Sequence, residues 1–377
     1  MSLDLLARQA REVWEVPRDL LLRRYPPFVT GGPLPRGHVP VFVFHGVEPD
    51  SFGRKLHYLA DNGYRTLSAA EYLDILSGSA PAPERAVVLT FDDGRASLAS
   101  VGAPLLERHG MTGIVFLVPG RTPMRAAPSF AAGADTSLLA WNQVESLAAS
   151  GTFDFQSHTL HHARIHVAPR VTGFMAPWMR HGYAAFDVPL IERGGRDLLP
   201  EDVPLGTPLL RSEPRTSEAL RFHEDPSAGQ ACIEAVASAG GEAFFERPGW
   251  ERELRRITAR RTFGGRLEGQ ADREAAIRRE LQEARTLIER RTGRPVVHLC
   301  YPWHVSGPTA RRLAREAGYR TAFCGKVPRV TITPPGGDPQ AIARIGEDYV
   351  ELLPGRGRDS LLAVLRRKWS RRMRGGS

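Results

Sequence analysis

The sequence predicts an α/β fold, because short apolar runs typical of buried strands alternate with helical patterns along the chain. Residues 87–91 form an apolar run closed by an Asp-Asp-Gly turn at residues 92–94, as expected of a buried strand that ends at a polar turn. Residues 153–157 alternate apolar and polar side chains as a half-buried strand does. Between residues 276 and 292, apolar residues recur on one helical face. This alternation favours a sheet with helices packed against it.

Length and charge are those of a globular enzyme rather than a nucleic-acid-binding protein. The 377 residues, 42% of them hydrophobic, are enough for one barrel-sized domain with additions. The formal net charge is +9, but the basic residues are nearly all arginines spread along the chain, since Lys55, Lys326 and Lys368 are the only lysines. Such a spread does not form a binding stripe. We therefore expect no nucleic acid among the partners.

Cysteine usage and the N-terminal sequence favour a cytoplasmic location. Three cysteines without metal-like spacing predict neither a disulfide framework nor a structural zinc site. Residues 1–24 lack the basic start, apolar core and small-residue cleavage site of a secretory signal.

The two ends of the chain carry patterns with two interpretations each. Residues 351–377 are expected to form a basic amphipathic helix and tail, because apolar residues at near-helical spacing are interleaved with arginines and a lysine. The apolar positions are Leu361, Leu362, Leu365, Trp369 and Met373. The helix either lies peripherally on an anionic membrane at its inner face or packs on the protein. Residues 1–37 form an N-terminal extension with a leucine-rich helical stretch and the same two alternatives.

Two short motifs predict a metal site. Asp92 and Asp93 follow a predicted strand, and ligands bind at the carboxyl ends of strands in α/β folds. His158 and His162 are four residues apart, and two imidazoles with one carboxylate suit Zn²⁺ or a similar divalent ion. Two other pairs have permissible ligand spacing, His158 with His161 and His162 with His166. A simple turn and a histidine-rich surface loop remain the alternatives.

The motifs and their order resemble the polysaccharide deacetylases of the NodB-homology group, also called carbohydrate esterase family 4. That group is marked by Thr-Phe-Asp-Asp-Gly, here residues 90–94, and by His-[Ser/Thr]-x-x-His, which selects His158, Thr159 and His162. Further similar segments follow in order at residues 41–47, 52–72, 296–303 and 317–322. The resemblance implies a distorted TIM-like (β/α) barrel formed by residues 38–162 and 276–350.

The resemblance also implies the reaction. Asp93, His158 and His162 would hold one divalent metal ion, with zinc expected first and cobalt, nickel, manganese or iron as alternatives. Asp92 would be the general base that takes a proton from metal-bound water, and the backbone N–H of Tyr301 would stabilise the oxyanion. The expected substrate is an N-acylated amino sugar in a glycan, glycolipid or nucleotide-sugar precursor, which loses its N-acetyl group. Deformylation or hydrolysis of another C–N bond, and a non-catalytic carbohydrate-binding relative, are the competing hypotheses.

Three further residues are expected beside the substrate, and two family features are missing. Pro302 and Trp303 belong to the third motif, and His45 ends the first predicted strand. Many family members carry an arginine two residues before this proline, where it braces the catalytic aspartate; here the position is Cys300. A neutral thiol cannot supply that charge. The group that braces Asp92 is therefore unassigned.

The general acid is also unassigned. The family's last motif, Leu-x-His, has no convincing match near the C-terminus. Because the leaving amine must be protonated, some other group has to act as the acid. The candidates are His45, His181 and His304, and each also suits a structural role.

Residues 163–275 form a large insertion relative to the family core. The insertion leaves the barrel directly after a predicted metal ligand, so we expect it to form a lid or a specificity wall at the mouth of the site. Its aromatic residues could stack on a sugar or pack a small core of the insertion itself. They include Phe174, Trp178, Tyr183 and Phe186.

Overall fold

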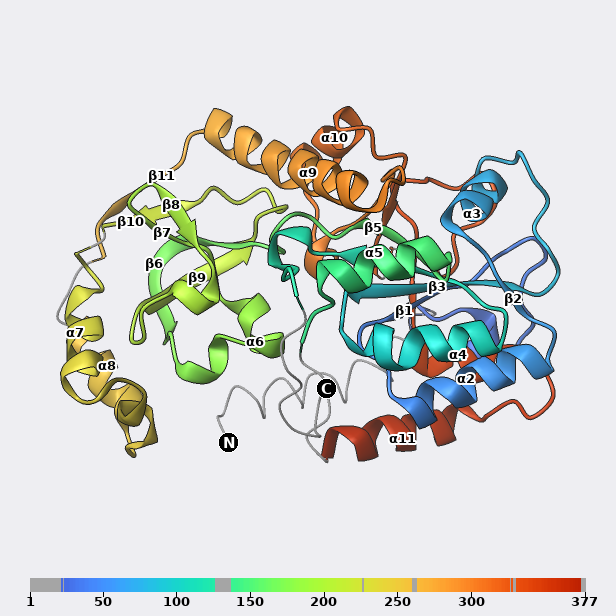
Figure 1. Ribbon diagram of the computed structural model, residues 1–377, viewed down its shortest axis with the longest axis horizontal. Helices are drawn as coiled ribbons and strands as arrows, with labels where there is room; N and C mark the ends of the chain where they lie inside the picture. Colours follow the sequence, from blue (N-terminus) through green and yellow to red (C-terminus); the bar gives the residue numbers. More distant parts are fainter. Residues whose placement is uncertain are drawn as a thin grey trace.

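The computed structural model describes residues 22, 24–125, 137–225, 227–259, 263–325, 327 and 330–373. An eight-stranded sheet forms the centre of the protein, in the order β13-β12-β5-β4-β3-β1-β14 with β2 paired to β3, and every pair in it is parallel (Figure 1). Its strands are β1 (Val41–Phe44), β2 (Arg65–Thr66), β3 (Ala86–Asp93), β4 (Gly113–Leu117), β5 (Phe153–Ser157), β12 (His298–Cys300), β13 (Thr321–Phe323) and β14 (Ile345–Gly346).

The sheet curls into an open barrel, which confirms the predicted distorted α/β barrel. Residues 342–346 run along the seam between its two ends. Ile342 forms a parallel bridge with Phe323 of β13, and Ile345 pairs with Phe42 of β1. Arg344 lies between these two contacts, so its side chain enters the structure at the seam.

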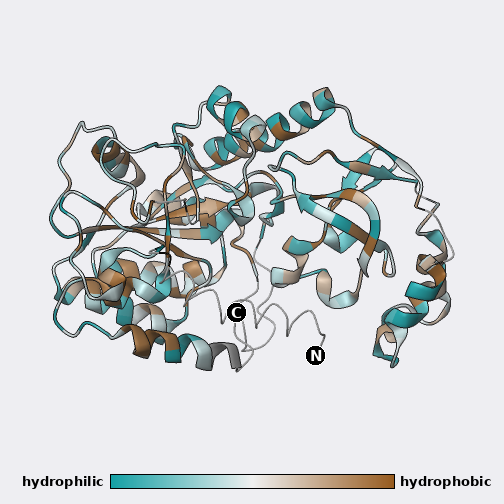
Figure 2. Cartoon of the chain, turned by 180° about the vertical axis from the view of Figure 1, so that it is seen from behind, coloured by the Kyte–Doolittle hydropathy of each residue, from teal (hydrophilic) through white to brown (hydrophobic). Residues whose placement is uncertain are grey.

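Each face of the sheet is buried in its own hydrophobic core. On the outer face, Phe91 stacks on Phe44 at 5.1 Å and meets Phe153 edge-on at 5.5 Å, and the helices α2, α4, α5, α9 and α10 pack against this layer. On the inner face, α3 contributes Tyr72 to a second core with Phe323. The helices of the barrel are α2 (Pro49–Asp61), α3 (Ala69–Leu76), α4 (Ala103–Arg108), α5 (Trp141–Ser150), α9 (Gln270–Thr292) and α10 (Pro308–Glu316). Figure 2 shows the hydrophobic strands at the centre of this body.

Helix α9 begins at Gln270, earlier than the start at residue 276 suggested by the apolar pattern. Four of its first six residues are polar or charged, and the two alanines, Ala271 and Ala275, are exposed, so this stretch carries no hydrophobic periodicity that could have marked the start. The helix still packs the predicted face, with Ile277, Leu281 and Ile288 buried in the barrel core.

Residues 164–267 form a separate lobe beside the barrel, and α9 runs above both in Figure 1. The lobe holds three antiparallel strand pairs and no strand of the main sheet among its described residues. Its elements are β6 (Arg164–Phe174), α6 (Gly182–Asp187), β7 (Ile191–Arg193), β8 (Arg196–Leu198), β9 (Pro208–Pro214), β10 (Phe222–Glu224), α7 (Gln230–Ser238), α8 (Trp250–Ala259) and β11 (Gly265–Leu267). Phe174, Cys232, Phe244 and Leu254 are buried together in a core of the lobe.

The two chain ends differ in how far the structure describes them. The predicted N-terminal helical stretch lies almost entirely outside the described residues. At the other end, α11 (Leu361–Met373) packs on the barrel through the buried Val364, while Leu362 and Trp369 are 58% and 64% exposed. No helix within the described ranges combines the length and the apolar character needed to cross a bilayer.

Candidate active site

The two predicted motifs meet because their strands are neighbours in register. Asp93 of β3 pairs with Leu117 of β4, which pairs with Ser157 of β5. His158 directly follows Ser157 and therefore lies one residue beyond this row. Its backbone N–H donates to the Leu117 carbonyl at 2.8 Å. Parallel strands place the carboxyl ends of β3 and β5 at the same edge of the barrel, so both motifs lie there.

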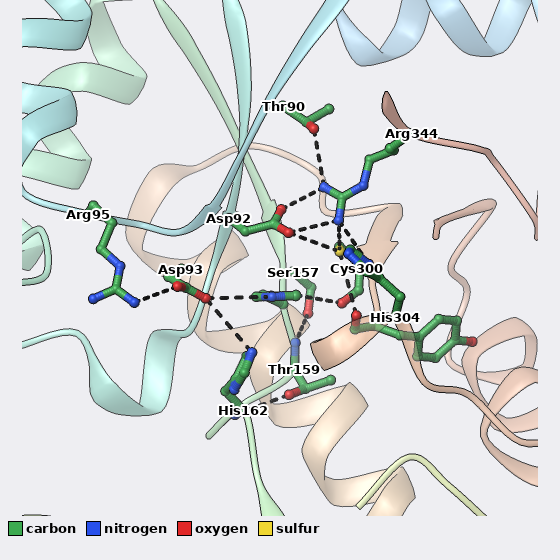
Figure 3. Close-up of polar contacts among 12 residues, drawn as sticks. Thr90, Asp92, Asp93, Arg95, Ser157, Thr159, His162, Cys300, His304 and Arg344 are labelled. Carbon is green, nitrogen blue, oxygen red and sulfur yellow. Dashed lines mark hydrogen bonds and ion pairs between the residues drawn. The ribbon is translucent and has the colours of Figure 1, made fainter. Parts of the chain in front are cut away.

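Asp93 faces both predicted histidine ligands. Its Oδ1 lies 3.7 Å from Nε2 of His158 and 3.8 Å from Nε2 of His162 (Figure 3). These distances are too long for hydrogen bonds and short enough for the three atoms to share one ion. The other carboxylate oxygen, Oδ2, accepts a hydrogen bond from Arg95 at 2.6 Å.

The protonation states suit metal ligands. Nδ1 of His158 lies 2.8 Å from the Cys300 carbonyl oxygen, which can only accept, so Nδ1 carries the proton and Nε2 has a free lone pair. Burial and the neighbouring His158 hold the pKa of His162 well below its usual value, which keeps that ring neutral. Burial opposes ionisation of Asp93, but His45 and Arg95 lower its pKa to about 2.

The donor set therefore fits a divalent ion held by Asp93, His158 and His162. A second group of donors, formed by Asp92, His158 and Cys300, has similar spacing. Cys300 Sγ accepts a hydrogen bond from Arg344 at 3.0 Å, so the sulfur is already engaged. Both oxygens of Asp92 are bound elsewhere, which leaves the first group as the better metal site.

The other two histidines of the motif region are structural. His161 Nδ1 lies 2.7 Å from Glu280 of α9, and His166 is bonded to Glu224 at 2.5 Å. His166 Nε2 also accepts from the backbone N–H of Leu210. The alternative ligand pairs that the sequence spacing allowed are therefore wrong.

Arg344 braces Asp92, a role that the sequence left unassigned. Its two terminal nitrogens donate to Oδ1 and Oδ2 of Asp92 at 2.7 and 2.8 Å (Figure 3). One of them also donates to Cys300 Sγ at 3.0 Å and the other to Thr90 Oγ1 at 3.2 Å. Burial alone would raise the pKa of Asp92, but the Arg344 charge outweighs it and holds that pKa well below the usual value. Asp92 is thus an ionised, oriented carboxylate beside the metal ligands.

The third motif lies on the opposite side of the metal ligands. Tyr301 directly follows β12 and is fully buried, and the predicted contact of its backbone N–H with substrate stays a prediction. The Trp303 ring lies 4.1 Å from the His162 ring, which puts it in the wall of the site. Pro302 is buried at the start of a short turn, and its predicted contact with substrate stays a prediction.

The candidate acids differ in their surroundings. Phe44 of β1 pairs with Phe91 of β3, so His45 lies beside Asp92, and it is exposed at the mouth. His304 Nδ1 accepts from Arg344 at 3.3 Å, and desolvation and the Arg344 charge lower the pKa of His304. His181 is an exposed residue preceding α6.

Comparison with known proteins identifies the family. Residues 79–174 match the model of polysaccharide deacetylases, and this stretch contains Asp92, Asp93, His158 and His162. The part of the chain that carries both motifs is thus similar to polysaccharide deacetylases. It is 29% identical over 138 residues to poly-β-1,6-N-acetyl-D-glucosamine N-deacetylase of Escherichia coli K12, a match that covers 36% of the chain and 20% of that relative. The chain thus corresponds to about a fifth of the length of this curated relative.

Solved structures share the fold of this chain over most of its length. A de-N-acetylase from Aggregatibacter actinomycetemcomitans superposes with a TM-score of 0.52 at 17% identity, covering 86% of this chain and 98% of the other. The BpsB deacetylase domain from Bordetella bronchiseptica gives 0.50 at 17% identity, covering 83% and 98%. At these identities the likeness concerns the fold.

In this chain, the guanidinium that braces Asp92 comes from an element other than the third motif. Where many members carry it in the third motif, this chain has Cys300, and the guanidinium arrives from the seam residue Arg344 instead. The two positions converge because Cys300 on β12 and Arg344 beyond β13 both face the barrel interior (Figure 3). Sequence reasoning missed Arg344 because a lone arginine outside any motif carries no signal in a chain rich in arginine.

Backbone strain is concentrated in this site. Within the described ranges, the non-glycine residues with left-handed φ are Asp93, Thr159, His162, Trp303 and His304. Such conformations cost about 1–3 kcal/mol each and persist where the surrounding structure enforces them. Gly94 is also left-handed, and an added Cβ there would lie 2.5 Å from a Leu117 methyl, so the turn requires glycine.

Helix α6 of the insertion covers one side of the site. The Tyr183 ring lies over Arg95 at 3.8 Å, and Phe186 meets the His162 ring edge-on at 4.8 Å. Phe186 also contacts Arg121, whose guanidinium is 4.2 Å from the ring centre. Phe174, in contrast, is buried in the core of the lobe, so a contact of that side chain with a sugar is wrong.

Proposed function

We propose that this chain is an N-deacetylase that hydrolyses the acetamido group of N-acetylglucosamine-type residues in a glycan. The observation that carries the proposal is the pairing of an ionised carboxylate, Asp92, with the three-donor site of Asp93, His158 and His162. When bound there, a divalent ion acts as a Lewis acid that makes water more acidic and a carbonyl carbon more electrophilic. Family membership and the name of the Escherichia coli relative support the substrate class.

The residues divide the reaction between them. Asp92 takes a proton from the attacking water, and Arg344 keeps its carboxylate ionised and oriented for this step. The backbone N–H of Tyr301 donates to the carbonyl oxygen as negative charge develops on it. The C–N bond then breaks, the amine receives a proton, and the products are acetate and a free amino sugar.

We assign the proton donor to His45. His304 is a poor acid, because Arg344 donates to its Nδ1 and the lowered pKa keeps its ring neutral. His181 is an exposed residue before α6, whereas His45 lies beside Asp92 and lowers the pKa of both Asp92 and Asp93. An exposed position at the mouth also allows His45 to be reprotonated from solvent.

The decisive experiment measures acetate released by the purified chain from β-1,6-linked N-acetylglucosamine oligomers, with N-formylated oligomers as a parallel substrate. Asp92→Asn should retain metal and lose roughly three orders of magnitude in kcat, because the general base is gone. His158→Ala should lose the metal, while the matched His161→Ala variant keeps it. Near wild-type turnover by Asp92→Asn would remove Asp92 as the base, and release of formate without acetate would favour deformylation.

A further inference from the structure

The insertion lobe presents an exposed tryptophan, Trp178, shortly before helix α6 in the chain. Trp178 is 56% exposed, an unusual exposure for a large aromatic side chain. Its ring meets Phe245 and Trp250 edge-on, with both pairs of ring centres 5.9 Å apart. Phe245 packs in turn on Trp250 at 4.9 Å, so the exposed ring is held in place by a rigid aromatic base.

A surface pocket adjoins this tryptophan. It has a volume of about 460 Å³ and is lined by Gly249, Trp250, Glu251, Arg252 and Arg255 at the start of α8. Glu251 and Arg255 are paired at 2.7 Å, and Arg252 is exposed beside them. The pocket therefore combines an aromatic wall with planar groups that both donate and accept hydrogen bonds.

This combination fits the chemistry of a sugar ring. The axial C–H groups of a pyranose carry slight positive charge and pack on the negative face of an aromatic ring. Its hydroxyls donate and accept hydrogen bonds at the rim, which guanidinium and carboxylate groups satisfy together. A purely apolar partner would offer Glu251 and Arg252 no hydrogen bonds, whereas the hydroxyls of a sugar can use both groups.

We propose that Trp178 and the pocket beside Trp250 form a glycan-binding subsite on the insertion, remote from the metal ligands. The segment between them leads directly to the catalytic centre. After Trp178, α6 places Tyr183 over Arg95 and Phe186 against His162. Figure 1 shows α6 between the α7–α8 end of the lobe and the barrel. A glycan of several sugar units would bridge the two places, which makes the preferred substrate a chain rather than a single sugar. This step rests on the proposed deacetylase function.

The kinetic test compares substrates of increasing length. Acetate release is measured with β-1,6-linked N-acetylglucosamine oligomers of one to about six units. For Trp178→Ala, the ratio of kcat/KM for the longest oligomer to that for the monomer should fall about tenfold, equivalent to about 1.4 kcal/mol, through a higher KM. Trp178→Phe should recover most of the ratio. Leu267→Ala, which removes a side chain of the same lobe that is 54% exposed, should leave the ratio unchanged.

A binding measurement separates this inference from the proposed catalysis. The full chain carrying Asp92→Asn is titrated calorimetrically with the longest oligomer, and Trp178→Ala in that background should raise Kd about tenfold. Loss of acetate release from every oligomer together with Trp178-dependent binding would overturn the catalytic function and leave the subsite standing. Equal Kd values with and without Trp178, or a kinetic loss that is the same for monomer and oligomer, would overturn the subsite.

Discussion

At Asp92, burial and charge act in opposite directions on one carboxylate. The side chain is almost fully buried, which favours the neutral acid, yet two hydrogen bonds from Arg344 favour the anion. The pair is buried on both sides, with Arg344 also inaccessible to solvent. Two buried groups stay ionised only while both are present, so the charge on Asp92 depends on Arg344 and the reverse.

Removing Arg344 should therefore disable Asp92 without emptying the metal site. In Arg344→Met, the pKa of Asp92 is expected to rise, because burial is no longer opposed by the guanidinium. Since the base must be ionised, the acid limb of the kcat/KM profile should move to higher pH, with a loss of about 100-fold near neutrality. Metal content should stay that of the wild type.

A second variant makes this prediction more specific. Adding Cys300→Arg to Arg344→Met returns an arginine to the position that many family members use, and part of the rate should recover. A wild-type pH profile for Arg344→Met would contradict the assigned role. So would a parallel loss of metal, since Arg344 contacts none of the three ligands.

The site was predictable from the sequence where its groups are neighbours along the chain. Asp92 and Asp93 are adjacent, and His158 and His162 belong to one short motif, so residue type and spacing carried the information. Arg344 joins them only through the closing seam of the barrel, a long-range contact that no local pattern encodes. The apolar runs predicted a sheet with helices packed against it, and the resemblance to a known family predicted that the sheet curls into a barrel. The start of α9 was missed because its first residues have no apolar period.

At the scale of single elements, α6 connects the insertion with the metal ligands. It is only a short helix, and its ring contacts reach Arg95, Arg121 and His162. Aromatic rings on guanidinium groups contribute about 0.5–2 kcal/mol each, depending on desolvation. The helix thus packs on His162 and on Arg95, which donates a hydrogen bond to Asp93, so it supports the predicted metal ligands without being a ligand itself.

Removing the ring contact between α6 and His162 should weaken metal binding. Phe186→Ala removes the ring that packs on His162 and lets water reach Arg95, so we expect about a tenfold lower affinity for Zn²⁺ in chelator competition. Tyr183→Phe keeps its ring over Arg95 and should bind the ion as the wild type does. Unchanged affinity in Phe186→Ala would show that α6 is only a cover.

Helix α11 also presents exposed apolar side chains. We propose that this helix contacts anionic membranes. Leu361 and Val364 pack towards the barrel, while Leu362 and Trp369 are exposed on a helix that also carries the exposed Arg366. Arg367 and Lys368 are paired with acidic residues of the barrel, so they add little to surface attraction. Binding would combine insertion of Trp369 with the positive charge of the tail.

Vesicle sedimentation tests this contact. The wild-type chain should bind vesicles containing about 30% anionic lipid more strongly than neutral vesicles, and Trp369→Ala should reduce that binding about fivefold. The variant should keep the oligomer kinetics of the wild type. Equal binding to neutral and anionic vesicles, or no binding by the wild type, would leave α11 as a packed structural helix.

At the scale of the whole molecule, a buried ion pair links the two chain segments at the base of the insertion. Arg215, which follows β9, donates to both oxygens of Glu268, which precedes α9, at 2.6 and 2.9 Å. Glu268 also accepts from the backbone N–H of Arg221 at 2.8 Å. The pair therefore links two chain segments of the lobe at the place where the chain returns to the barrel.

Breaking this pair should lower the stability of the folded chain. In Glu268→Ala, the guanidinium of Arg215 stays buried without its counter-charge. The free energy of unfolding measured in urea should therefore fall by about 3–5 kcal/mol. Glu251→Ala breaks the exposed pair with Arg255 on α8 and should cost less than about 1 kcal/mol. Similar losses of unfolding free energy in the two variants would show that the buried pair stabilises the chain no more than an exposed pair does.

The position of Arg344 in the seam also has a consequence during synthesis. Asp92 and Arg344 are separated by 252 positions. Ribosomes extend a chain at about 5–20 residues per second, so Asp92 is made roughly 13–50 s before the guanidinium that keeps it ionised. A nascent or prematurely terminated chain therefore displays both hallmark motifs while its base still lacks a counter-charge, and the catalytic centre becomes complete only when the last strand of the barrel has been translated.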